Sequence, residues 1–262
     1  MDSLFFLENS IGQLILSAFI VLAAAYAHGV LGLGFVSVAM PILVLLISFR
    51  SAMVLTVPVA FFLTARMTFF GSKTREVFRI FWPLPFFMIW GGLTGSWIFQ
   101  NVSTNVLLWI ISGALFLFLS VDLLRGNLPQ LPERWVMPVG MLAAFLAGNT
   151  EASVNMGAPF LLLFSLLTSL STQTIVQVFN LCFFTGKALQ FVTLSVGGQN
   201  NPSVGLTEWI PGLLLVPVAI LLCNRGILLR ERISVDTYRQ WLKGILFLVA
   251  TVLLGQLILD GH

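Results

Sequence analysis

Charged side chains are scarce in this chain. Asp, Glu, Lys and Arg make up 9% of its 262 residues, whereas about a quarter of a typical globular domain is charged. Hydrophobic residues make up 58%, and the mean hydropathy is +1.00. Such a chain cannot cover its surface with groups that water solvates. We therefore expect an all-α polytopic membrane protein, because helices satisfy their own backbone groups in lipid.

Cysteine and histidine are also rare, with two of each. Cys182 and Cys223 lie in apolar segments without metal-ligand spacing, so we interpret both as packing residues and expect no metal or cofactor. The net charge of +3 comes mostly from short loops and not from a basic patch with interleaved aromatic residues, which excludes nucleic acid as an expected partner. The N-terminus lacks the features of a signal peptide, so we expect the first apolar segment to be retained.

An internal repeat is present. Residues 39–43 (AMPIL) resemble residues 157–161 (GAPFL), and residues 61–66 (FFLTAR) resemble residues 182–187 (CFFTGK). The offset grows along the chain, as expected when two copies of one unit accumulate loop insertions independently. The repeat predicts a single transport domain with a first membrane repeat over 1–130 and a second over 131–262.

Apolar segments divide evenly between the two copies. They lie at residues 10–30, 33–48, 51–70, 80–99, 105–124, 134–149, 156–170, 172–195, 209–224 and 241–259. Several have the ~20 residues that span a bilayer, whereas 33–48, 134–149 and 156–170 are short enough to be tilted spans or arms of re-entrant hairpins. We expect about eight to ten membrane segments, with broken or re-entrant helices at the centre.

Basic residues indicate the orientation. Ten of the thirteen Lys and Arg residues fall in loops on one side when the segments alternate, and the opposite loops, 100–104 and 197–202, carry no charge. The basic side is expected to be cytoplasmic, which places both termini outside. Because each copy has an odd number of segments, the second repeat is predicted to be inverted relative to the first.

Three basic residues remain, Arg50, Arg66 and Lys187. Arg50 lies in a turn and is expected to face external water or headgroups. Arg66 and Lys187 occupy equivalent positions about fifteen residues into their segments, where a cation costs at least ~2.5 kcal/mol and usually faces a cavity or a partner. We predict that both bind one shared anion. The alternative for Arg66 is that it snorkels to the cytoplasmic interface.

A polar or glycine-rich break precedes a proline in each copy. The breaks are residues 27–37 (AHGVLGLGFVS) and residues 148–157 (GNTEASVNMG). Glycine exposes backbone N–H groups, and a helix that starts after a break directs its positive end at the site, so both features suit an oxyanion. The predicted substrate-binding residues are Arg66, Lys187, Gly32, Gly34, Ser37, Asn149, Ser153 and Asn155. The alternative is that the glycines serve only helix packing.

Glu151 and His28 are the candidate proton carriers. Glu151 is the acidic residue placed deepest in an apolar zone, and the proline register aligns it with Leu33, so a titratable acid is predicted in one repeat only. A static ion pair with Lys187 is the alternative for Glu151. For His28, with a pKa near neutrality in water, the alternative is a hydrogen-bonded packing role.

These motifs resemble the TauE/SafE family of sulfite and organosulfonate exporters. The resemblance rests on the Gly-x-x-Gly-x-Gly stretch at 29–34 leading to Pro41, on the second copy ending at Pro159, and on the five-segment layout over nearly the whole chain. Residues 149–159 (NTEASVNMGAP) depart from the Gly-rich run expected there. The resemblance implies a secondary transporter, multi-pass in the bacterial inner (plasma) membrane, that exports sulfite, sulfoacetate or a related sulfonate.

Two other classes of function use some of the same residues. An anion channel or uniporter would also need the buried cations, although Glu151 would hinder an anion pore. An intramembrane enzyme is disfavoured because the chain has no GxSG nucleophile turn and no HExxH zinc pair. We therefore expect a proton-linked transporter and not an enzyme. Its expected partners are a small anionic substrate and the lipid bilayer, with a homodimer as a possible assembly.

Overall fold

The computed structural model of the chain is built of α-helices. It describes residues 10–32, 34–70, 74–123, 130–197 and 202–230, together with 247 and 251, and these contain no β-strand. The helices are α2 (Ile11–Leu31), α3 (Phe35–Leu43), α4 (Phe49–Phe69), α5 (Thr74–Phe81), α6 (Pro83–Asn101), α7 (Thr104–Leu123), α8 (Glu133–Val154), α9 (Ala158–Leu166), α10 (Thr172–Val196) and α11 (Leu206–Arg230). The all-α class is confirmed for this part of the chain. The predicted segment at 241–259 lies almost entirely outside it.

Several helices are long and apolar enough to cross a membrane. Among the described residues these are α2, α4, most of α10 and most of α11, four in all. The helices α5 and α6 form a fifth candidate if they are one span, bent by 68°. The predicted segment at 80–99 corresponds to α6 and the last two residues of α5, and the two helices are separate because Pro83 at the start of α6 lacks the N–H that would continue α5.

Both breaks have the same construction. The long helix before each one ends at a residue in the left-handed conformation, Gly32 (φ 82) after α2 and Asn155 (φ 62) after α8. Two residues further on, Gly34 and Gly157 cap the short helices α3 and α9. Each break is thus only three residues long, narrower than the sequence indicated.

The short helices α3 and α9 are half-spans. Each has nine residues, and nine residues at 1.5 Å each cover about 14 Å, less than half of the ~30 Å hydrocarbon core. The short apolar segments at 33–48 and 156–170 therefore contain half-helices. In contrast, the segment at 134–149 belongs to the 22-residue α8.

The polar residues before the second break remain helical because their side chains bond within the helix. Thr150 Oγ1 donates to the carbonyl of Leu146 at 3.0 Å, and Ser153 Oγ donates to the carbonyl of Asn149 at 2.8 Å. A hydroxyl group bonded in this way needs no partner outside the helix, so it does not draw the backbone away from the helical conformation.

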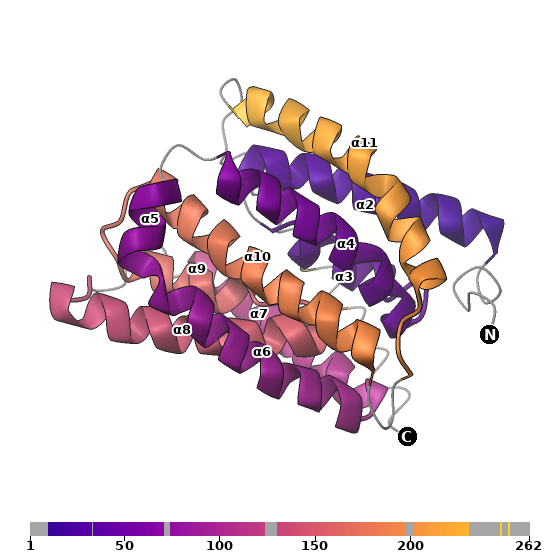
Figure 1. Ribbon diagram of the computed structural model, residues 1–262, viewed down its shortest axis with the longest axis horizontal. Coiled ribbons are helices and arrows are strands. Elements are labelled where there is room, and N and C mark those ends of the chain that lie inside the picture. Colours follow the sequence, from indigo (N-terminus) through magenta and orange to yellow (C-terminus); the bar gives the residue numbers. More distant parts are fainter. Residues whose placement is uncertain are drawn as a thin grey trace.

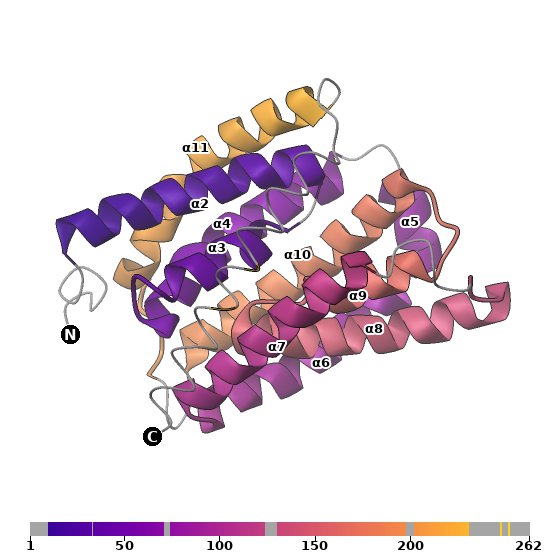
Figure 2. The ribbon, with the colours of Figure 1, turned by 180° about the vertical axis from the view of Figure 1, so that it is seen from behind.

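The helices pack in pairs drawn from the two halves of the chain. Helix α2 lies against α11, α6 lies against α8, and α4 and α10 pack together between these pairs (Figures 1 and 2). The sequence colours in Figure 1 show that α2 runs from the right of the molecule to the left, whereas α8 runs from left to right. Helices α4 and α10 are opposed in the same way.

Glycines allow these pairs to approach closely. A Cβ atom on Gly29 would overlap the carbonyl group of Cys223 where α2 meets α11. A Cβ atom on Gly91 would overlap the carbonyl group of Phe145 where α6 meets α8. Close approach of backbones at small residues is a usual way for helices to associate in lipid. Gly29 thus has a packing role.

Candidate functional site

A pocket lies where the two breaks meet. It is lined by residues of six helices: α2, α3, α4, α8, α9 and α10. Gly34 and Ser37 come from the start of α3, and Ala158 comes from the start of α9. Both half-helices therefore present their N-terminal ends to one space, where the positive ends of their dipoles favour an anion.

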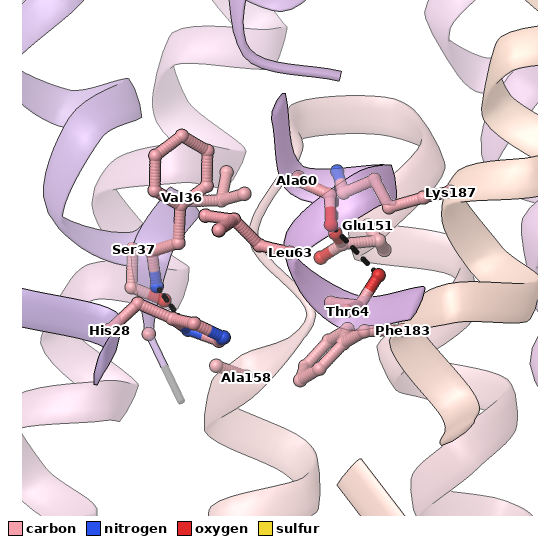
Figure 3. Close-up of a pocket in the computed structure, with 12 residues that line it drawn as sticks. His28, Val36, Ser37, Ala60, Leu63, Thr64, Glu151, Ala158, Phe183 and Lys187 are labelled. Carbon is pink, nitrogen blue, oxygen red and sulfur yellow. Dashed lines mark hydrogen bonds and ion pairs between the residues drawn. The ribbon is translucent and has the colours of Figure 1, made fainter. Parts of the chain in front are cut away.

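Lys187 and Glu151 form an ion pair in the wall of this pocket. Lys187 Nζ is 2.6 Å from Glu151 Oε1, and the two side chains are 1% and 3% exposed. Figure 3 shows this pair on one side of the pocket, with His28 and Ser37 on the other. The predicted meeting of the two breaks, the acid and the cation is thus present in the structure, whereas their role in binding substrate stays a prediction.

The ammonium group of Lys187 has two further partners. It donates to Gln190 Oε1 at 2.8 Å and to Asn155 Oδ1. Asn155 Nδ2 in turn donates to Thr56 Oγ1 at 2.8 Å, which ties the second break to α4. An ammonium group has three N–H donors, so all of them are used. A substrate anion can therefore reach Lys187 only by displacing one of these oxygens.

The second carboxylate oxygen of Glu151 binds the start of α9. Glu151 Oε2 accepts a hydrogen bond from the backbone N–H of Gly157 at 2.7 Å. The carboxylate is thus held by a buried ammonium group on one side and by a helix N-terminus on the other. These are the two kinds of donor that bind oxyanions in proteins. The Glu151 carboxylate therefore occupies a place that fits a small oxyanion.

His28 and Glu151 hold equivalent positions in the two halves. Each is four residues before the left-handed residue that ends its helix, and the N–H of that residue bonds to its carbonyl, at 2.7 Å for Gly32 and 2.9 Å for Asn155. The proline register, which aligned Glu151 with Leu33, is therefore wrong.

The two equivalent side chains also bond alike. His28 Nδ1 accepts a hydrogen bond from the N–H of Phe35 at 3.4 Å, just as Glu151 accepts one from Gly157. Each side chain thus fastens its own helix to the start of the half-helix that follows. The pocket is therefore lined by His28 from the first half and by Glu151 from the second, and both side chains are buried.

Other predicted site residues lie away from the pocket lining. The guanidinium group of Arg66 lies 4.5 Å above the ring of Phe70 near the end of α4. Asn149 donates to Thr94 Oγ1 at 2.8 Å, which joins α8 to α6. Gly32 donates its N–H to the carbonyl of His28, and its own carbonyl group accepts a hydrogen bond from a side chain of α10. Substrate contacts for Arg66, Asn149, Gly32 and Ser153 stay predictions.

Sequence reasoning missed three residues around the pocket. Thr64 lines it from α4, Gln190 holds Lys187, and Asn180 on α10 donates to the carbonyl of Gly32 at 3.1 Å. A helical spacing could have found the last two, because positions three and seven residues from Lys187 share its face of the helix. Thr64 could have been found from its match to Thr185 in the repeated stretch.

The pocket carries groups that can bind an anion and hold a proton. Within the described ranges, no three His, Cys, Asp or Glu side chains lie together as metal ligands would. The site offers one acid, one imidazole, one ammonium group and two helix N-termini around a small space. Such a set can exchange a proton and an anion, as a proton-linked carrier must.

Comparison with protein families gives a match over nearly the whole chain. The model described as "Sulfite exporter TauE/SafE" matches residues 17–253. Comparison with curated proteins and with solved structures gave no significant match. The match covers both breaks, the half-helices and the pocket between them. The chain therefore belongs to the TauE/SafE family of sulfite exporters, a family of membrane transporters.

Proposed function

We propose that the chain is a secondary transporter that exports a small sulfur-containing oxyanion, such as sulfite, sulfoacetate or a related sulfonate, across the bacterial inner membrane. Membership of the sulfite exporter family supports this class of substrate. The observation that carries the proposal is the binding of the Glu151 carboxylate by Lys187 and by the N–H of Gly157. Those donors would hold the oxyanion when Glu151 releases them.

The proposed architecture is a pair of inverted repeats over residues 1–130 and 131–262. Three features support it. The breaks share one construction, the matching helices α2 and α8 run in opposite directions, and α2 packs against α11 of the second half as α8 packs against α6 of the first. Inverted repeats allow a carrier to open to either side by equivalent motions around one central site.

Proton linkage is proposed because the anion and the Glu151 carboxylate compete for Lys187. An anion that binds Lys187 displaces a negative charge, and that charge would be buried without a partner unless Glu151 took up a proton. Unpaired charge inside a membrane protein is costly, so protonation accompanies binding. His28, the equivalent residue of the other half, is the proposed second proton carrier on the far wall of the pocket.

The charge balance of the site favours joint movement of anion and proton. In the empty site, ionised Glu151 and Lys187 sum to zero. With a monoanion bound and Glu151 protonated, the sum is again zero, so both forms can pass through a low-dielectric state at a modest cost. Anion and proton then move in the same direction, and accumulation of the anion in the cytoplasm drives export.

The proposal is tested by counterflow in proteoliposomes. Proteoliposomes loaded with unlabelled sulfite should accumulate labelled sulfite, and the rate of uptake should saturate as the sulfite concentration rises. Sulfoacetate, thiosulfate and sulfate should be compared as competitors. A pH gradient imposed across the membrane should drive sulfite toward the alkaline side, because protons and anion move together. Flux that does not saturate and ignores the pH gradient would instead indicate an anion channel.

A further inference from the structure

We infer that a second oxyanion-binding station lies around Arg50, on the external side of the substrate pocket. This inference rests on the proposed function, since it concerns the route of the same anion. A separate and smaller pocket is lined there by residues that include Arg50, Ser96, Gln100, Thr193 and Gly197. None of its described lining residues is acidic.

Arg50 is only partly satisfied in this pocket. Its Nη2 atom donates to the carbonyl of Pro202 at 2.7 Å, whereas its Nη1 atom is buried and has no hydrogen-bond partner in the described part of the chain. A buried, charged donor without an acceptor is unfavourable. Guanidinium groups stay protonated and present paired N–H groups that match the oxygens of an oxyanion. A small oxyanion would therefore satisfy Nη1.

The two pockets lie along one helix. Lys187 lines the substrate pocket from α10, and Thr193 of the same helix and Gly197, which caps its end, line the Arg50 pocket. These positions are about 9–15 Å apart along the helix axis at 1.5 Å per residue. The sequence neighbours Glu151 and Ala152 likewise line one pocket each. The Arg50 pocket is thus the next space along α10.

A buried, hydrogen-bonded glutamine lies between the two sets of lining residues along α10. Gln190 lies between Lys187 and Thr193 on α10, and its amide donates to the carbonyl of Glu151 at 3.1 Å while its oxygen accepts from Lys187. Gln100, Gly197 and Pro202 line the Arg50 pocket, and they belong to the uncharged stretches 100–104 and 197–202 of the sequence, which are expected to be external. An anion that passes Gln190 would therefore meet Arg50 before it leaves the protein.

Two sources could supply an oxyanion to Arg50, a free anion in transit or the phosphate of a lipid headgroup. Burial of Nη1 favours the small free anion. The test therefore includes binding to protein in a phospholipid-free detergent. Equilibrium dialysis with labelled sulfate and with labelled sulfite, under anaerobic conditions, measures the number of sites and their affinity. Arg50→Gln removes the charge but keeps an amide donor for the carbonyl of Pro202.

The second measurement compares the two faces of the membrane. In right-side-out vesicles, Arg50→Gln should raise the sulfite concentration for half-maximal flux at least tenfold, because a buried charge partner of the anion is lost. In inside-out vesicles that concentration should change less than twofold. Arg50→Lys keeps the charge without the paired donors and should give a smaller rise, about threefold. Arg225→Gln, which removes an exposed charge on α11, is the matched control.

Loss of one class of sulfate or sulfite site in detergent together with the one-sided change in flux would support the station. An unchanged external half-saturation and unchanged binding in folded Arg50→Gln would overturn it. So would a defect that appears only when anionic phospholipid is present, since that indicates a headgroup site. If wild-type protein moves no sulfite from either side, the proposed function fails, and the dialysis result still reports on the Arg50 pocket.

Discussion

At the scale of single residues, the Lys187–Glu151 pair dominates the energetics of the site. Removing one partner of a buried ion pair leaves an uncompensated charge and typically costs about 3–5 kcal/mol, whereas replacing both partners by neutral groups is often tolerated. The two side chains are 1% and 3% exposed, so solvent would do little to screen the charge that is left, and we expect the whole of this cost. Single and double variants can therefore separate the structural role of the pair from its role in binding.

The first prediction concerns Lys187. We expect Lys187→Met to lower the free energy of unfolding by about 3–5 kcal/mol, and the double variant Lys187→Met/Glu151→Gln to recover most of that loss. Sulfite affinity of the double variant should nevertheless fall at least tenfold, because the anion has lost its cation. Thermal unfolding in detergent and equilibrium dialysis measure the two effects. Wild-type affinity in the folded double variant would contradict the proposed site.

The second prediction concerns Glu151. Glu151→Gln keeps the size of the side chain but cannot exchange a proton, so it should still exchange anion for anion while losing flux driven by a pH gradient. The comparison is made in proteoliposomes with and without an imposed gradient. Gradient-driven flux equal to that of the wild type in a folded variant would end the coupling hypothesis. Reduced folding yield with intact coupling would favour the static ion pair.

Single residues also show how much of the site could be predicted from the sequence and how much could not. The sequence indicated Lys187, Glu151, Ser37 and the meeting of the breaks, because polar groups are conspicuous in apolar segments. It did not indicate that His28 matches Glu151. Pro41 is the seventh residue of α3, whereas the proline of α9 is the second residue of that helix, so a register based on prolines is shifted by five positions.

At the scale of helices, close crossing of α6 and α8 depends on glycine. We predict that Gly91→Ala destabilises the protein by a few kcal/mol, since the new Cβ would overlap the backbone carbonyl of Phe145 and force the helices apart. Gly113→Ala on α7 is the matched control. Its Cβ would have no neighbour within 4 Å, and alanine favours a helix by about 0.5–1 kcal/mol over glycine. Equal unfolding temperatures for the two variants would contradict this assignment.

The extent of the breaks could not be read from composition alone. Residues 148–154 include Gly, Asn, Thr and Ser, which favour loops in water, but all are helical here. Gly148 is needed for contact with α6, and the hydroxyl groups bond to carbonyls one turn earlier. Tertiary packing and local bonding thus override the intrinsic preferences of these residues.

At the scale of the whole molecule, the orientation can be tested by cysteine labelling. Both native cysteines are buried, so introduced cysteines report without a background. Ser103→Cys, at an exposed position between α6 and α7, should react with an impermeant maleimide added to intact cells. Arg134→Cys, exposed near the start of α8, should react only after the membrane is opened. The reverse pattern would invert the assigned topology.

The exchange of partners between the two halves also bears on biosynthesis. Helix α2 packs against α11, whose residues are translated almost 200 positions later. At about 5–20 residues per second, roughly 10–40 seconds pass between them. During that interval the glycine-containing face of α2 has no native partner, and lipid or a chaperone must cover it. The first half is therefore a natural substrate for membrane quality control until its other half has been inserted.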